Sequence, residues 1–195
     1  MIFTNGCSFT YGDELDKPYS EAWPYILSKM LDQDVVNFAE NGKDNESILH
    51  STKEYHHLTH SQYNVKVPKI WIIQWTTFRR FSNNPPIDVV LNKLDEQYLL
   101  DLYFMHVKDM QEWFEWHGYP YLMFNGFDNE RYIPDNNSEF KSLIDDKYFI
   151  GWPDEALVNW VYGMLHKPKG HPGEEAHVRI AEILYENIRH KLRLS

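Results

Sequence analysis

Short apolar runs and longer amphipathic stretches follow one another along this chain. The short runs are β-prone and bounded by Gly, Pro or Asn, which predicts strands. The longer stretches repeat apolar residues at spacings of three and four, which predicts helices. The predicted strands are Ile2–Thr4, Asp34–Phe38, Pro68–Trp75, Tyr121–Phe124 and Tyr148–Ile150, and the predicted helices run from Ser20 to Leu31, Asp44 to His60, Leu94 to His117, Asp154 to Leu165 and Gly173 to Leu192.

This alternation predicts an α/β fold with a parallel sheet, because helical crossovers of ten or more residues join neighbouring parallel strands. Ile70–Ile73 is an unbroken apolar run, which is typical of a strand buried on both faces and places it in the middle of the sheet. Function collects at the carboxyl ends of the strands in such sheets. The loops that follow Thr4, Phe38 and Trp75 are therefore the first places to search for a site.

Composition limits the classes of protein to consider. The 195 residues are 43% hydrophobic and carry a formal charge of −10, which fits one globular domain spanning 1–195. Basic residues are scattered among acids, so we expect no nucleic-acid partner, and no apolar run is long enough for a membrane span. Cys7 is the only cysteine. With no signal-peptide pattern at the start, we expect a cytoplasmic protein of undetermined oligomeric state.

Three short blocks occupy the expected loops. Gly6–Gly12 follows the first predicted strand, Asn37–Gly42 includes the end of the second, and Gly170–Gly173 precedes the last helix. In order and spacing over the whole chain, these blocks resemble the SGNH (GDSL-type) hydrolases, a family of esterases and acylhydrolases. The resemblance implies a three-layer α/β/α sandwich, flavodoxin-like, with five parallel strands in the order 2-1-3-4-5.

The resemblance also implies roles for individual residues. Ser8 matches the family's nucleophile, and His171 matches its general base. Ser8 and Gly42 match the positions whose backbone N–H groups form the oxyanion hole. Thr76 stands where the family has the third oxyanion donor, an Asn.

The chain departs from the family pattern at three positions. Cys7 replaces the Asp before the nucleophile, and Thr76 replaces the oxyanion Asn. Pro168 stands where the family has the Asp that orients the base. Loss of that carboxylate is serious, since replacing it by an amide in serine proteases lowers the rate by about 10⁴. A backbone carbonyl or His166 is an alternative acceptor for the ring.

The implied activity is hydrolysis of a small ester or O-acyl group through an acyl-enzyme. A serine hydroxyl needs a base to take its proton and preorganised donors for the oxyanion, and Ser8, His171 and Gly42 supply that minimum. The alternative is a catalytically weak or inactive relative that binds a glycan or a protein partner. A third reading is acyl transfer to a sugar or another acceptor by the same chemistry.

Residues on the loops around the site suggest what the substrate is. Tyr11 and Trp75 are aromatic candidates for stacking on a sugar or lining an acyl pocket, and Arg79 is a candidate for binding a carboxylate or phosphate. An ion pair that anchors its loop is the alternative role of Arg79. The overall negative charge favours a neutral ester or an acylated sugar as substrate. We expect no metal and no organic cofactor; His56 and His60, four residues apart, are interpreted as a solvated face of a helix.

Overall fold

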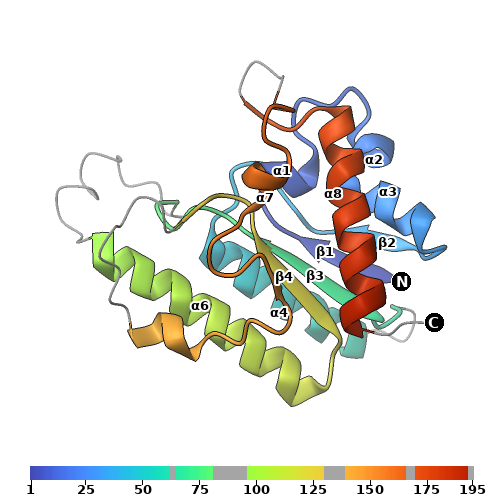
Figure 1. Ribbon diagram of the computed structural model, residues 1–195. Coiled ribbons are helices and arrows are strands. Elements are labelled where there is room, and N and C mark those ends of the chain that lie inside the picture. Colours follow the sequence, from blue (N-terminus) through green and yellow to red (C-terminus); the bar gives the residue numbers. More distant parts are fainter. Residues whose placement is uncertain (62–64, 81–95, 130–138, 166–169, 193–195) are drawn as a thin grey trace.

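The computed structural model describes residues 1–61, 65–80, 96–129, 139–165 and 170–192. Its described strands form one parallel sheet in the order β2-β1-β3-β4-β5 (Figure 1), which confirms the predicted topology. The strands are β1 (Ile2–Asn5), β2 (Val35–Asn37), β3 (Ile70–Trp75), β4 (Tyr121–Asn125) and β5 (Phe149–Ile150). Every residue of β3 is buried, as expected for the central strand.

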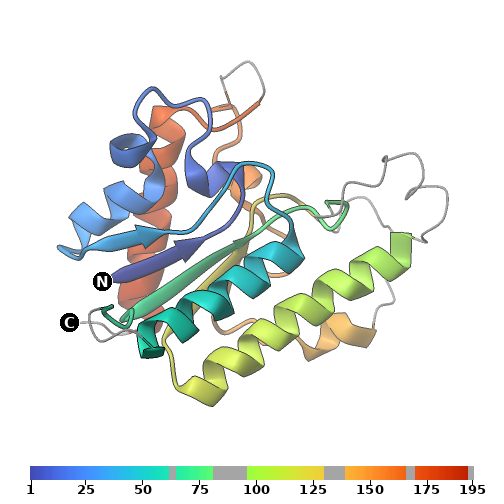
Figure 2. The ribbon, with the colours of Figure 1, turned by 180° about the vertical axis from the view of Figure 1, so that it is seen from behind.

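Helices cover both faces of the sheet, so the predicted three-layer α/β/α sandwich is confirmed (Figures 1 and 2). One face carries α4 (Asn45–Ser61) and α6 (Glu96–His117), and the other carries α3 (Trp23–Met30) and α8 (Glu174–Asn187). Side chains alternate along a strand. Phe3 therefore packs in the α4–α6 core, whereas its neighbour Ile2 packs in the α3–α8 core.

Several predicted helices are shorter than the apolar spacing indicated. The predicted helix Ser20–Leu31 is two helices, α2 (Pro18–Glu21) and α3, separated by Ala22 in an extended conformation. Pro24 lies in the first turn of α3, where its missing N–H and fixed φ favour a helix start. The predicted helix Asp154–Leu165 is reduced to α7 (Leu157–Trp160).

The remaining described elements are short. A four-residue helix, α1 (Ser8–Tyr11), follows β1, and η1 (Glu139–Leu143) precedes β5. The last predicted helix ends as α8 at Asn187 and continues as a π-helical segment, η2 (Ile188–Leu192). On α6, Leu99 and Tyr103 are buried, whereas Tyr98 and Met105 are exposed.

Candidate active site

The predicted nucleophile and oxyanion residues follow the carboxyl ends of three adjacent strands. Ser8 is the first residue of α1 and comes three residues after the end of β1, Gly42 lies in the turn between β2 and α4, and Thr76 directly follows β3. Because β2, β1 and β3 are neighbours in the sheet, these loops leave the same edge. This is the edge where parallel α/β sheets place their sites.

Ser8 is held in a closed environment. Its side chain is buried, and its Oγ lies 4.0 Å from the Sγ of Cys7. Cys7 is fully buried in the α3–α8 core, so its side chain points into the protein and away from solvent. The described hydrogen bonds include none between Ser8 and His171. In this structure the Ser8 hydroxyl is therefore not hydrogen-bonded to the proposed base.

A buried amide braces the loop that carries Ser8. The Oε1 of Gln74 accepts a hydrogen bond from the Oγ1 of Thr10 at 2.7 Å, and its Nε2 donates to the Trp75 carbonyl at 3.0 Å. The same amide lies against the positions that a Cβ would occupy at Gly6 and Gly126. Both glycines therefore make room for Gln74, which sequence reasoning did not single out.

The turn at Gly42 is held in place by the buried side chain of Lys43. Gly42 has φ +79°, a left-handed conformation that favours glycine. The next residue, Lys43, is buried and its Nζ donates to the Phe38 carbonyl at 2.7 Å and to Oδ1 of Asn5 at 3.2 Å. Burial lowers the pKa of Lys43 from its usual value. These bonds fix the turn relative to β1 and β2.

Thr76 has a fixed backbone and an unused hydroxyl. Its N–H donates to Oδ1 of Asn45 at 2.9 Å, and its carbonyl accepts from Nδ2 of Asn129 at 3.2 Å. Its own Oγ1 is buried and has no hydrogen-bond partner among the residues that the structure describes. Buried hydroxyls are normally hydrogen-bonded, so a buried Oγ1 without a described partner is unusual.

His171 is held by an acidic loop that follows α1. Its Nδ1 lies 2.8 Å from Oε2 of Glu14, and its Nε2 lies 3.7 Å from Oδ2 of Asp13. The ring also packs edge-on against Phe9, with ring centroids 5.5 Å apart. Since Phe9 is the residue after Ser8, the predicted base lies beside the predicted nucleophile loop.

Neither acid of this loop was identified from the sequence. The family resemblance implies an orienting carboxylate three residues before His171. That position is Pro168, which lies outside the described residues. The alternative acceptor, His166, also lies outside them. The available signal was two adjacent acids, Asp13 and Glu14, directly after the glycine that ends the nucleophile block.

The three residues predicted to contact the substrate lie in different environments. Trp75 is the last residue of β3 and is fully buried, with its Nε1 donating to the Met123 sulfur at 3.5 Å, so its predicted position on a loop is wrong. Arg79 forms an ion pair with Glu96 at 2.6 Å, which is the anchoring role given as its alternative. Tyr11, at the end of α1, is partly exposed and stays a candidate.

Other candidate ligand sites lie apart from this edge. His56 is buried and hydrogen-bonded to the Tyr119 hydroxyl at 3.0 Å, so the interpretation as a solvated histidine face is wrong for this residue. Within the described ranges, no three His, Cys, Asp or Glu side chains are arranged to hold a metal ion, and no helix is long and apolar enough to cross a membrane.

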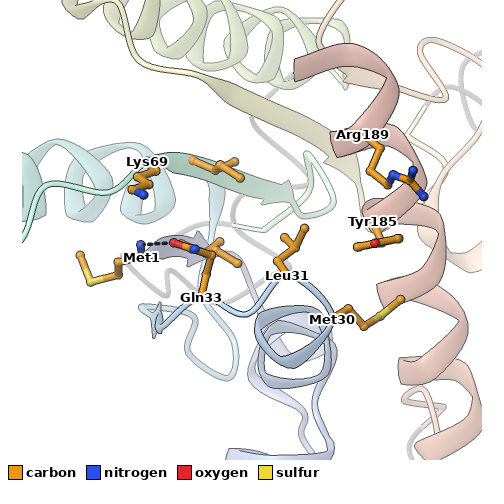
Figure 3. Close-up of a pocket in the computed structure, with 9 residues that line it drawn as sticks. Met1, Met30, Leu31, Gln33, Lys69, Tyr185 and Arg189 are labelled. Atoms are coloured by element: carbon orange, nitrogen blue, oxygen red, sulfur yellow. Dashed lines mark hydrogen bonds between the residues drawn. The ribbon is translucent and has the colours of Figure 1, made fainter. Parts of the chain in front are cut away.

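A cavity of about 480 Å³ opens at the opposite edge of the sheet (Figure 3). Its wall includes Ile2 and Ile70, the first residues of β1 and β3, with Tyr185 and Arg189 on the side of α8. Because parallel strands begin at this edge and end at the other, the cavity is separate from the site around Ser8.

A second buried histidine gives the fold a predicted pH dependence. His177 of α8 is fully buried and accepts a hydrogen bond from the Trp23 N–H at 3.1 Å. Burial, with a smaller contribution from His171, lowers the pKa of His177 to about 4.

Below pH 6.5 the unfolded chain therefore binds a proton at His177 that the folded chain does not, and the free energy of unfolding falls as the pH drops toward 4. We expect a loss of about 3 kcal/mol over this window. Urea unfolding at several pH values, compared with His177→Gln, isolates this contribution; an equal pH dependence in both proteins would contradict it. His190→Gln, at an exposed position, is the control.

The fold of this chain is similar to that of the GDSL or SGNH-type hydrolases. Solved structures of that class share its architecture over nearly the whole chain. No family model matches the sequence, and no curated protein matches it either. The likeness is therefore one of fold.

Three solved structures illustrate the likeness. A putative lipolytic protein of the G-D-S-L family from Desulfitobacterium hafniense has a TM-score of 0.62 at 17% identity, covering 95% of this chain and 97% of its own. The psychrotrophic esterase EstA from Pseudoalteromonas, in a structure inhibited by monoethylphosphonate, has a TM-score of 0.60 at 14% identity, covering 99% and 98%. AlinE4, an SGNH-hydrolase family esterase, has a TM-score of 0.56 at 17% identity, covering 98% and 94%.

Proposed function

We propose that this protein hydrolyses a small ester or O-acyl group through an acyl-enzyme on Ser8, with His171 as the general base. The observation that carries the proposal is the contact of the His171 ring with Phe9, because it brings a largely buried histidine that is paired with a carboxylate to the loop of the candidate nucleophile. The fold supports it further, since EstA and AlinE4 are esterases with the same architecture.

The reaction follows the ordinary course of serine acyl transfer. As Oγ of Ser8 attacks the ester carbonyl carbon, its proton passes to Nε2 of His171, and the carbonyl oxygen becomes an oxyanion. Collapse breaks the bond to the alcohol, which leaves with the proton from His171. Water then repeats the sequence on the acyl-enzyme, so that the products are the alcohol and the carboxylic acid.

Three donors are proposed to stabilise the oxyanion. They are the backbone N–H of Ser8, the backbone N–H of Gly42 and the Oγ1 of Thr76. The Ser8 N–H precedes the first hydrogen bond of α1, which runs from the Thr10 N–H to the Cys7 carbonyl at 3.0 Å. The unpartnered hydroxyl of Thr76 supports its place in this set. Preorganised donors of this kind are each worth about 10²–10³ in rate.

The charge of the chain supports a neutral substrate. With a formal net charge of −10, the protein repels polyanions. The one cation proposed for the site, Arg79, is paired with Glu96. A short-chain ester or an acylated sugar is thus favoured, with the partly exposed Tyr11 as its aromatic contact. Transfer of the acyl group to an acceptor alcohol instead of water is a variant of the same chemistry.

The second candidate function is binding of a glycan or protein partner with little or no catalysis. The observation that favours it is the Oγ of Ser8, whose described contact is the Cys7 sulfur and not His171. The two candidates differ in whether acyl chemistry depends on both residues.

A panel of short-chain nitrophenyl esters and acetylated sugars, with the wild type and His171→Ala, tests the proposal. We expect at least one substrate to be hydrolysed by the wild type and kcat to fall by about 10³-fold or more in His171→Ala. His190→Ala, which removes an exposed histidine, is the matched control. The catalytic proposal would be overturned if His171→Ala hydrolysed the substrate as fast as the wild type. It would also be overturned if the wild type bound a glycan but hydrolysed no substrate of the panel.

A further inference from the structure

We propose that Glu14 is the positioning carboxylate for His171, in place of the family's acid that the chain lacks at Pro168. The inference rests on the proposed function for its catalytic consequence. It assigns the role to a different segment of the chain, the loop after the nucleophile helix instead of the loop before the last helix.

The contact between the two side chains fixes the protonation of the ring. Oε2 of Glu14 lies 2.8 Å from Nδ1 of His171, and both side chains are largely buried, with exposed fractions of 12% and 13%. An ionised carboxylate only accepts hydrogen bonds, so Nδ1 carries the proton. Nε2 of the neutral ring then has a free lone pair, which is what a general base needs.

The backbone of Glu14 is held in a conformation that its side chain disfavours. Its φ is +68°, in the left-handed region that non-glycine residues seldom adopt. Two backbone bonds hold the loop in place, from Asp13 N–H to the Ser8 carbonyl at 3.1 Å and from Leu15 N–H to the Gly12 carbonyl at 3.2 Å. The first ties the acidic loop directly to the nucleophile. Such backbone strain clusters at functional sites.

The neighbouring acid is less suited to the role. Oδ2 of Asp13 lies 3.7 Å from Nε2 of His171, which is beyond hydrogen-bonding distance. The same oxygen accepts a hydrogen bond from Nδ2 of Asn41 at 3.0 Å, which holds it toward the turn of Gly42. Glu14 therefore orients the ring, and Asp13 links the acidic loop to the oxyanion turn.

Glu14 acts on the reaction through His171 and does not take a proton itself. When Nε2 receives the proton of Ser8, the ring becomes an imidazolium with N–H groups on both nitrogens. The ionised Glu14 beside Nδ1 stabilises that cation and keeps Nε2 directed at the reacting oxygens. An amide in its place is able to present its NH₂ group to Nδ1, which selects the wrong tautomer.

Kinetics of Glu14→Gln test the role. We expect kcat to fall by roughly 10²–10⁴-fold with KM nearly unchanged, because the ground-state substrate does not touch Glu14. Asp16→Asn, which removes an exposed carboxylate of the same loop, is the matched control and keeps the wild-type kcat. A Glu14→Gln enzyme within threefold of the wild type, or a larger loss in Asp13→Asn than in Glu14→Gln, overturns the assignment.

Two further measurements distinguish a positioning role of Glu14 from an effect on folding, and test that role independently of the proposed hydrolysis. Glu14→Gly relieves the backbone strain, so it stays folded yet loses kcat, and added formate restores part of the rate; a Glu14→Gly enzyme with wild-type kcat contradicts the role. ¹⁵N NMR of His171 in the wild type at neutral pH shows the proton on Nδ1, and Glu14→Gly shifts it toward Nε2. If the wild type has this tautomer but hydrolyses nothing, the proposed function fails and the positioning stands; an Nε2–H ring in the wild type overturns the positioning.

Discussion

Ser8→Ala is expected to lower kcat for ester hydrolysis by about 10⁴-fold or more. Loss of the hydroxyl removes the covalent route, and the remaining rate comes from the oxyanion donors and binding alone. We expect the fold to tolerate the change, because the one polar contact of Ser8 Oγ among the described residues is with the Cys7 sulfur, at 4.0 Å. Steady-state kinetics on the best substrate of the ester panel measure the effect.

The control for this substitution is Ser20→Ala. Ser20 is exposed on α2 and its Oγ contacts only the Lys17 carbonyl among the described bonds, so we expect the wild-type rate. A Ser8→Ala protein that retains more than a tenth of the wild-type kcat would show that another group attacks the ester, and the acyl-enzyme would have to be assigned elsewhere.

Gly126→Ala is expected to be the most damaging conservative change to the fold near the site, costing about 3 kcal/mol in the free energy of unfolding. A Cβ at this position meets the amide of Gln74 and the Trp75 carbonyl. To make room, Gln74 must give up the hydrogen bonds that it makes to Thr10 and Trp75. Urea unfolding monitored by tryptophan fluorescence measures the loss.

A double mutant distinguishes this clash from a general effect of the extra methyl group. In a Gln74→Ala background the amide is absent, so Gly126→Ala should cost less than 1 kcal/mol further. Equal losses in both backgrounds would show that Gln74 is not the obstacle.

The topology was predictable from the sequence because it depends on burial. Ile70–Ile73 is apolar on both faces, and only the middle of a sheet between two helical layers buries both. Lengths of the short helices were not predictable in the same way. Asp154–Leu165 has helical spacing, but only Leu157–Trp160 is helical, because apolar spacing does not report whether backbone hydrogen bonds continue.

Candidate site residues were predictable from the sequence only where a recognisable sequence block contains them. Ser8 and His171 were proposed from their positions in the sequence blocks, and the structure places the His171 ring against Phe9, the residue after Ser8. Glu14 was missed because its role depends on a contact between residues 157 positions apart, which no local pattern encodes. Trp75 was proposed as a substrate contact but is buried. The sequence does not distinguish the last buried residue of a strand from the first exposed residue of the loop after it.

The acyl-enzyme on Ser8 is the central claim, and its most direct test is covalent labelling with an alkyl fluorophosphonate followed by peptide mass spectrometry. We expect one phosphonate adduct, located on Ser8, and no adduct on this peptide in Ser8→Ala. We also expect slower labelling in His171→Ala, because the hydroxyl then lacks its base. An adduct on another residue, or equal labelling of the wild type and Ser8→Ala, would contradict it.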